Sequence, residues 1–246
     1  MKPTVSLLGI PFSAMTVAEA HRYLAQRLRQ PDVAKIYTPN PQILWRASQS
    51  PSLSRLLRRA DLLLPDGAGV ILAAKRKGTP LPCRITGIDT AEWLLRYGAK
   101  RRLSFFFLGG TPGVARAAAD RMRKRIPYLK VVGTHHGYFK KSGAENDRVL
   151  EKIRRAEPDV IFVCFGFPEQ EKWIDRYTDS LPSVKLAMGL GGTLDVWAGK
   201  MKRAPKALQA MHLEWLWRTL CEPKRIKDLP CVFRFLRAST KKRYTP

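Results

Sequence analysis

The chain has 246 residues, 45% of them apolar, which is enough to bury a full hydrophobic core. Its 45 Lys and Arg against 20 Asp and Glu give a formal net charge of +25, which favours a polyanionic partner: nucleic acid, an acidic membrane or a diphosphate ligand. No run approaches the ~18 apolar residues of a membrane span. The four cysteines form no C-x-x-C pair, so we expect free thiols in a reducing cytosol and no zinc site.

The predicted elements alternate between short apolar strands and longer amphipathic helices. The first strand is expected at 5–15 and is not a signal peptide, because Pro11 interrupts the apolar run and no A-x-A cleavage site follows. The remaining elements, in chain order, are a strand at 33–37, a helix at 42–59, a strand at 61–64, helices at 68–77 and 90–98, a strand at 103–108, a helix at 114–125, a strand at 130–133, a helix at 146–156, a strand at 159–165, a helix at 169–178 and a strand at 184–190.

The strands at 103–108 (LSFFFL) and 159–165 (DVIFVCF) are almost continuous apolar runs, which is typical of a parallel sheet covered on both faces. We therefore predict an α/β fold with a mostly parallel, Rossmann-like sheet and helices on both faces. The alternation stops near Ala204. This predicts an α/β domain at 1–204 and a basic, amphipathic helical appendage at 205–246; residues 200–246 contain 13 basic and three acidic residues.

Small, amide and carboxylate residues follow five of the predicted strands. Ligands of such sheets bind at the carboxyl ends of the strands, so we expect these residues to lie at one edge of the sheet. The five groups are Thr38 with Asn40, Asp66, Gly109 with Gly110, Gly166 with Gln170, and Gly191 with Asp195.

Each group has both a functional and a purely structural interpretation. Asp66, in Pro-Asp-Gly, is either a general base for a sugar hydroxyl or an ordinary turn residue or helix cap. The 109–113 turn (GGTPG) either seats a phosphate at a helix N-terminus or is only a tight connection, and it departs from the G-x-G-x-x-G dinucleotide pattern. Thr38 and Asn40 either contact a ligand or cap a helix. Gln170 has an amide suited to bind substrate, and Asp195 is either a ribose contact or a cap.

No metal or cofactor is expected. His135 and His136 are adjacent, and on an extended chain their side chains should point apart. There is also no D-x-D motif to hold a divalent cation. A departing diphosphate would then need arginine or lysine for neutralisation, and the basic C-terminal stretch offers Arg203, Arg218 and Arg225.

Taken together, the motifs resemble the WecG/TagA/CpsF glycosyltransferase family over about residues 5 to 237. The matching stretches, in family order, are TPNPQIL (38–44), ADLLLPDGAGV (60–70), RITGID (84–89), FLGGTPGVA (107–115), VVGTHHGYF (131–139), FGFPEQEKW (165–173), GLGGTLDVWAGKMKRAP (189–205) and LEWLWRTLCEPKRI (213–226). The resemblance implies an inverting, metal-independent hexosyltransferase. It would move N-acetylmannosamine from its UDP donor to undecaprenyl-diphosphate-linked N-acetylglucosamine, in teichoic acid linkage-unit or related polysaccharide synthesis. Other members of the family transfer glucose or related hexoses in capsule and exopolysaccharide synthesis.

The resemblance also implies roles for individual residues. The family's base falls on Asp66, its pocket positions fall on Thr38, Asn40, Arg84 and Gln170, and a nucleotide contact falls on Asp195. Arg218 and Arg225 match an appendage that closes over the site at the membrane. Gly109, Gly110, Gly191 and Arg203 complete the expected substrate-binding set.

The implied partners are a UDP-sugar, a lipid-diphosphate-linked sugar and an anionic membrane surface, and a homo-oligomer stays open. The implied location is cytoplasmic, peripheral on the inner face of the bacterial plasma membrane. Two rival interpretations are a basic nucleic-acid-binding protein, for which no helix-turn-helix, zinc-finger or RNP-type motif is present, and a nucleotide-dependent oxidoreductase resting on the 109–113 turn alone.

Overall fold

The computed structural model describes residues 4–211, 214–221 and 229–239. It contains a six-stranded sheet in the order β4-β3-β8-β7-β5-β6, and the pairings β3–β8, β8–β7, β7–β5 and β5–β6 are parallel. This confirms the predicted α/β class. The strands of this sheet are β3 (Ala34–Tyr37), β4 (Leu62–Leu63), β5 (Ser104–Gly109), β6 (Lys130–His135), β7 (Val160–Cys164) and β8 (Leu186–Gly189).

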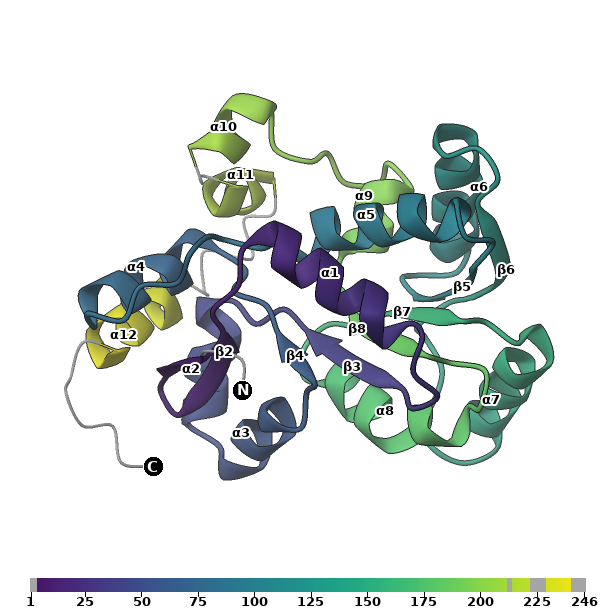
Figure 1. The fold of residues 1–246 in the computed structure, drawn as a ribbon, viewed down its shortest axis with the longest axis horizontal. Helices are drawn as coiled ribbons and strands as arrows, with labels where there is room; N and C mark the ends of the chain where they lie inside the picture. The colour runs from purple at the N-terminus through teal and green to yellow at the C-terminus, as the bar shows by residue number, and fades with distance from the viewer. Residues whose placement is uncertain (1–3, 212–213, 222–228, 240–246) are drawn as a thin grey trace. The chain divides into compact units, whose positions relative to one another are not determined.

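The chain divides into two compact units, residues 1–20, 38–86 and 203–246 in the first and residues 21–37 and 87–202 in the second. The second unit holds β3, β5, β6, β7 and β8. Every residue of β5 and β7 is buried, as expected for central strands that are covered on both faces. In Figure 1, α5, α6 and α9 lie on one side of these strands and α7 and α8 on the other. Their bounds are α5 (Gly87–Ala99), α6 (Val114–Arg125), α7 (Ala144–Ala156), α8 (Glu169–Tyr177) and α9 (Thr193–Trp197).

The single strand predicted at 5–15 is wrong: the segment is an antiparallel hairpin of β1 (Thr4–Leu7) and β2 (Ile10–Ser13). Leu8 and Gly9 form its two-residue turn, and both have positive φ, +48° and +78°. Such turns match the twist of the paired strands and usually carry Asn-Gly. Leucine is an uncommon residue at positive φ, so Leu8 does not mark a hairpin turn in the sequence.

A helix that the sequence analysis missed, α1 (Val17–Arg27), follows the hairpin. It begins with a reciprocal cap: the Thr16 N–H donates to Glu19 Oε2 at 2.8 Å, and the Glu19 N–H donates to Thr16 Oγ1 at 3.3 Å. The Thr-x-x-Glu spacing of this cap is a recognisable sequence signature of a helix start.

The single helix predicted at 42–59 is also wrong, because the chain forms two helices there, α2 (Pro41–Ser48) and α3 (Pro51–Arg58). Ser50 lies between them with extended backbone, and its Oγ accepts from the Leu53 N–H at 3.5 Å. Pro51 has no N–H to continue the first helix and instead starts the second. The spacing of the apolar residues continues unchanged from the first helix into the second. A prediction from periodicity alone therefore treated the two helices as one.

The first unit also contains α4 (Ala68–Arg76) and three C-terminal helices, α10 (Lys206–Ala210), α11 (Glu214–Cys221) and α12 (Leu229–Ser239). Helix α12 packs against α2 and α4, and Figure 1 shows it beside α4. Its Phe235 is fully buried. The domain boundary predicted between residues 204 and 205, and the role of 205–246 as an appendage, stay predictions.

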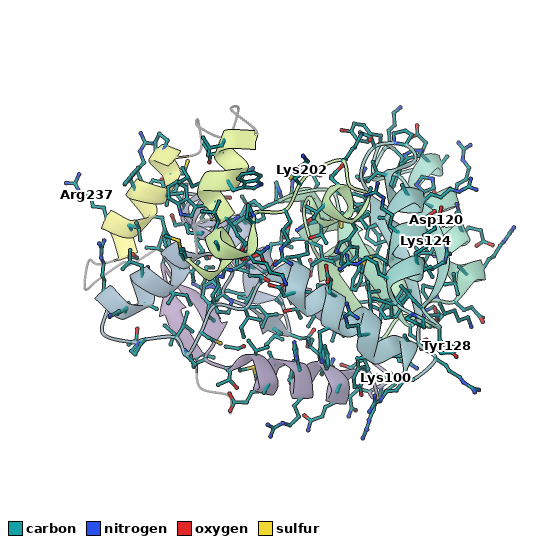
Figure 2. All side chains as sticks on the ribbon, turned by 90° about the horizontal axis from the view of Figure 1, so that it is seen from above. Lys100, Asp120, Lys124, Tyr128, Lys202 and Arg237 are labelled. Carbon is teal, nitrogen blue, oxygen red and sulfur yellow. The ribbon has the colours of Figure 1, made fainter. Side chains whose placement is uncertain are left out.

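The basic side chains are not confined to the C-terminal helices. Figure 2 shows Arg237 of α12 projecting outward, and it likewise labels the exposed Lys100 and Lys124 of the second unit. Among the described residues, no helix is long and apolar enough to cross a membrane.

Candidate active site

The predicted site residues fall into one group in each unit. Thr38, Asn40, Asp66, Arg84 and Arg203 belong to the first unit. Gly109, Gly110, Gln170, Gly191 and Asp195 belong to the second. Arg225 lies outside the described residues; Arg218 is part of α11, but its side chain is not described.

In the first unit, two tight turns meet at the N-termini of α2 and α4. Asn40 caps α2, because its Oδ1 accepts from the Ile43 N–H at 3.0 Å. A Cβ on Gly67 would lie 3.3 Å from Pro41 Cδ and 3.9 Å from Asn40 Cβ, so the two turns touch. Thr38 follows β3 directly and is half-buried. The structural interpretation of Asn40 as a cap is therefore correct, and the same contact places Asn40 beside the Pro-Asp-Gly turn.

Asp66 precedes α4 without capping it. The cap position is Gly67, whose φ of +96° suits glycine, and no side chain caps this helix. Asp66 is half-buried, one residue before a helix N-terminus, where the helix dipole favours a negative charge. The ionised carboxylate is the form that a general base needs.

Arg84 is brought to this turn by the backbone. The Ile85 N–H donates to the Pro65 carbonyl at 3.0 Å. This bond holds two segments of backbone side by side, one carrying Arg84 and the other carrying Asp66. The Arg84 guanidinium pairs with Glu214 of α11, with 2.8 Å between Nη2 and Oε2. The same carboxylate contacts Arg203, with 3.5 Å between Oε1 and Nε. Glu214 therefore links two predicted site residues, and the sequence analysis missed it.

In the second unit, the glycines at the end of β5, Gly109 and Gly110, are required for steric reasons. Gly109 has a φ of +144°, and a Cβ there would collide with the Cys164 carbonyl of β7. A Cβ on Gly110 would lie 2.6 Å from Val114 Cγ1 of α6, and the Gly110 carbonyl accepts from the Gly137 N–H at 2.8 Å. The tight-turn interpretation of these glycines is therefore correct. The N-cap residue of α6 is Gly113, which has no side chain to cap the helix.

Gln170 braces the turns after β7 and β8. Its side chain is almost fully buried; Oε1 accepts from the Gly166 N–H at 3.2 Å and from the Gly191 N–H at 2.9 Å. Its Nε2 donates to Glu171 Oε1 at 2.9 Å. These bonds hold two of the predicted strand-end turns together.

We expect Gln170→Ala to lower the free energy of unfolding by about 2–4 kcal/mol, because it leaves two N–H groups without their acceptor at about 1–3 kcal/mol each. Denaturant titration measures the change. Gln49→Ala is the matched control, since the Gln49 amide is exposed and donates to Ser48 Oγ at the surface. Equal stabilities of the two variants would contradict the bracing role.

Asp195 lies in the first turn of α9, whose cap position is Gly192, so the cap interpretation of Asp195 is wrong for this helix. Burial raises the pKa of the Cys164 thiol, and the nearby Asp195 carboxylate acts in the same direction. Asp195 is thus close to the end of β7, as the strand-end prediction requires. A neutral, buried Cys164 is unsuited to nucleophilic chemistry.

Two lysines at these turns were missed by the sequence analysis. Lys200 Nζ donates to Thr111 Oγ1 at 2.7 Å, which puts an ammonium beside the 109–113 turn. Lys141 Nζ donates to the carbonyls of Gly137 and Phe139 and lies 3.9 Å and 4.3 Å from the ring centroids of Phe139 and Phe165. Burial lowers the pKa of Lys141. The Lys200 contact joins residues 89 positions apart, and of the Lys141 contacts the one with Phe165 joins distant parts of the chain, so neither of these two has a local spacing signal.

The prediction that His135 and His136 point apart is wrong. Their ring centroids are 4.4 Å apart, and β6 ends at His135, so only the first of the two belongs to the strand. His135 Nδ1 lies 2.8 Å from the His136 carbonyl oxygen, and burial lowers the pKa of His135. Within the residues that the structure describes, no group of three or more His, Cys, Asp or Glu is arranged to hold a metal ion.

Comparison with known proteins agrees with the resemblance seen in the motifs. Residues 5–245 match the model of the glycosyl transferase WecG/TagA/CpsF family. A Bacillus spizizenii protein named N-acetylglucosaminyldiphosphoundecaprenol N-acetyl-beta-D-mannosaminyltransferase is 36% identical over 219 residues, 86% of this chain and 83% of the relative. A Staphylococcus aureus protein of the same name is 32% identical over 244 residues, 97% of this chain and 94% of the relative. The chain therefore belongs to the WecG/TagA/CpsF family of glycosyltransferases.

Proposed function

We propose that this glycosyltransferase moves N-acetylmannosamine from a UDP donor to an N-acetylglucosamine linked through diphosphate to undecaprenol. The relatives that cover nearly the whole chain carry the name of this activity. The observation that carries the proposal within the structure is the placement of Asp66. Asp66 is half-buried one residue before Gly67, the N-cap of α4, and the chain beside it bears Arg84.

The proposed reaction is a single in-line displacement. Asp66 takes the proton from the acceptor hydroxyl as that oxygen attacks the anomeric carbon, the bond to UDP breaks, and the anomeric configuration inverts. Arginine and lysine side chains, with Arg84 and Arg203 as the described candidates, neutralise the diphosphate in place of a divalent metal. Asp195 and the turns at Gly109, Gly110 and Gly191 are proposed to bind the UDP portion, with Lys200 as an added cation.

The test is UDP release from UDP-N-acetylmannosamine in EDTA, with and without a short-chain lipid-diphosphate N-acetylglucosamine acceptor. Acceptor-dependent release in EDTA supports the donor, the acceptor and metal independence together. Release only with UDP-glucose or another UDP-hexose would move the proposal to that donor. Silence with every UDP-sugar, combined with salt-sensitive retention on DNA, would favour the nucleic-acid alternative.

We further propose that the C-terminal helices bind an anionic membrane surface as a peripheral contact. Leu216 and Leu220 are four residues apart on α11 and thus on one side of it, next to Trp215. All three side chains are exposed, Trp215 at 50% and Leu220 at 68%. Exposed apolar side chains on a strongly basic segment are typical of helices that lie in the headgroup region.

We expect the double variant Trp215→Ser, Leu220→Ser to reduce binding to phosphatidylglycerol-containing vesicles by at least tenfold, since inserting a large apolar side chain contributes about 1.5–3 kcal/mol. Vesicle flotation measures the bound fraction. Tyr128→Ser is the control, because Tyr128 is 93% exposed but belongs to the second unit (Figure 2). Unchanged flotation of the double variant would contradict a membrane contact through α11.

A further inference from the structure

Two adjacent histidines at the end of β6 belong to the sequence motif at 131–139, to which the proposed function gives no role. The rings of His135 and His136 lie with their centroids 4.4 Å apart and an angle of 36° between their planes. Both side chains are half-buried. In a neutral imidazole one nitrogen donates a hydrogen bond and the other accepts one. The partner of one nitrogen therefore assigns the role of the other.

The backbone holds the two rings in opposite tautomers. His135 Nδ1 lies 2.8 Å from the His136 carbonyl oxygen, which can only accept, so Nδ1 carries the proton and Nε2 is an acceptor. The Tyr138 N–H donates to His136 Nδ1 at 3.2 Å, so His136 carries its proton on Nε2, which is a donor. Burial lowers the pKa of His135, which favours its neutral ring. The end of β6 thus carries one acceptor and one donor on neighbouring rings.

The Nε2 atoms are available to a ligand as far as the described residues are concerned. Within this part of the chain, the hydrogen bonds of the two rings involve Nδ1, and the other contact of His135 is an edge-on packing against Phe139, with 5.3 Å between ring centroids. The buried side-chain nitrogens that lack a partner among the described residues include neither Nε2 atom. Both atoms are therefore open to solvent.

The loop that carries the pair is fixed against the glycine turn that is proposed to bind the UDP portion. The Gly137 N–H donates to the Gly110 carbonyl at 2.8 Å, and a Cβ on Gly137 would lie 3.3 Å from Gly109 Cα. Lys141 Nζ closes the loop by donating to the carbonyls of Gly137 and Phe139. A donor and an acceptor that are fixed before the ligand arrives lose little conformational entropy on binding it.

We propose that His135 and His136 recognise the uracil base of the nucleotide donor. His135 Nε2 accepts from the N3–H of the base, and the His136 Nε2–H donates to the carbonyl oxygen at position 4. Cytosine presents the reverse order, an acceptor at N3 and an amino donor at position 4, so it would set acceptor against acceptor and donor against donor. This inference rests on the proposed function for the use of a UDP-sugar, and it names the residues that select the base.

The first experiment measures binding of UDP, CDP and 3-methyluridine diphosphate to the wild-type full chain by calorimetry. The methyl group on N3 removes the donor of the base and leaves the ribose and the diphosphate unchanged. We expect CDP and the methylated nucleotide to bind about tenfold more weakly than UDP, because a ring nitrogen is then left without its partner. Binding of either ligand as tight as that of UDP would overturn the proposal.

The second experiment repeats these titrations with His135→Asn and His136→Asn, which delete Nε2 and keep the bonds of the turn. An asparagine amide has an oxygen and an NH2 group near the position of Nδ1, so it can still accept from the Tyr138 N–H or donate to the carbonyl of residue 136. We expect each variant to bind UDP about fivefold more weakly, and its preference for UDP over CDP to fall by about the same factor. A variant with the wild-type preference would overturn the proposal for its histidine.

His21→Asn is the matched control. His21 is also half-buried and stacked on an aromatic ring, with 4.0 Å between its centroid and that of Trp93, but it lies on α1, which carries none of the predicted site residues. Its binding of all three nucleotides should be that of wild type, and a loss of preference equal to that of the pair would overturn the proposal. Thermal melting checks that the variants fold; for one that does not, the comparison of UDP with 3-methyluridine diphosphate on wild type decides.

Sugar transfer separates this inference from the proposed function. His135→Asn and His136→Asn should raise the KM for UDP-N-acetylmannosamine more than they lower kcat, because the base is remote from the anomeric carbon. A wild-type chain that selects UDP but transfers no sugar would contradict the proposed function and leave base recognition standing. Transfer by a chain that binds UDP and 3-methyluridine diphosphate equally would do the reverse.

Discussion

Replacing Asp66 with asparagine should lower kcat by about 10²–10⁴-fold, the range for loss of a general base. The amide is nearly the same size but cannot take the proton from the acceptor hydroxyl. Because the N-cap position of α4 is Gly67, the substitution leaves the cap residue of that helix unchanged. The measurement is the initial rate of acceptor-dependent UDP release in EDTA, together with thermal melting of both proteins.

The control for this experiment is Asp120→Asn. Asp120 pairs with Arg123 at 2.8 Å on the exposed side of α6 (Figure 2), so it changes the same charge at a site without a proposed role. Its rate and melting temperature should stay at the wild-type values. An Asp66→Asn enzyme with the wild-type rate would rule Asp66 out as the base, and a large drop in its melting temperature would make the rate uninformative about the base.

The second large effect is expected at Phe235. Phe235→Ala should lower the free energy of unfolding by about 3–5 kcal/mol, the usual cost of emptying a buried aromatic site. Phe235 is fully buried on α12, and this helix packs against α2 and α4. Denaturant titration measures the change.

Phe233→Ala on the same helix is the matched control, because Phe233 is 70% exposed. Its effect should stay within about 0.5 kcal/mol. If both variants were equally stable, α12 would not contribute to the core of the first unit. The result also decides how Arg218 and Arg225 are tested. Truncation after Pro205 would remove Phe235 together with these arginines, so a loss of stability at Phe235 would make single substitutions the better test.

The sequence was sufficient for the fold class because the relevant signals are local. Continuous apolar runs at β5 and β7 indicate buried parallel strands, and glycines at 109 and 110 mark a turn that no side chain fits. Where a local signal was weak or misread, the prediction failed. Leu8 takes a turn conformation that leucine rarely adopts, and Pro51 broke a helix whose apolar spacing continued through it.

The candidate site divides in the same way. Residue type, chain order and the family motifs were enough to predict Asp66, Arg84, Gln170 and Asp195 as site residues. Only the tertiary structure showed that Asn40 is a cap, that Asp66 is not, and that the Gln170 oxygen is used by two backbone N–H groups. Capping needs a particular backbone geometry, which the residue type favours but does not determine.

What the sequence by itself determined was the alternation of elements, the family and the charge of the chain. The partners of the charged groups were decided by the tertiary structure: Arg84 and Glu214 are 130 positions apart, and Lys200 reaches Thr111 across 89. The physical reason is that periodicity reports which face of an element is buried, whereas an ion pair depends on which elements meet. Packing decides which elements meet. The contacts of the Glu214 carboxylate with Arg84 and Arg203 were therefore visible only in the folded chain.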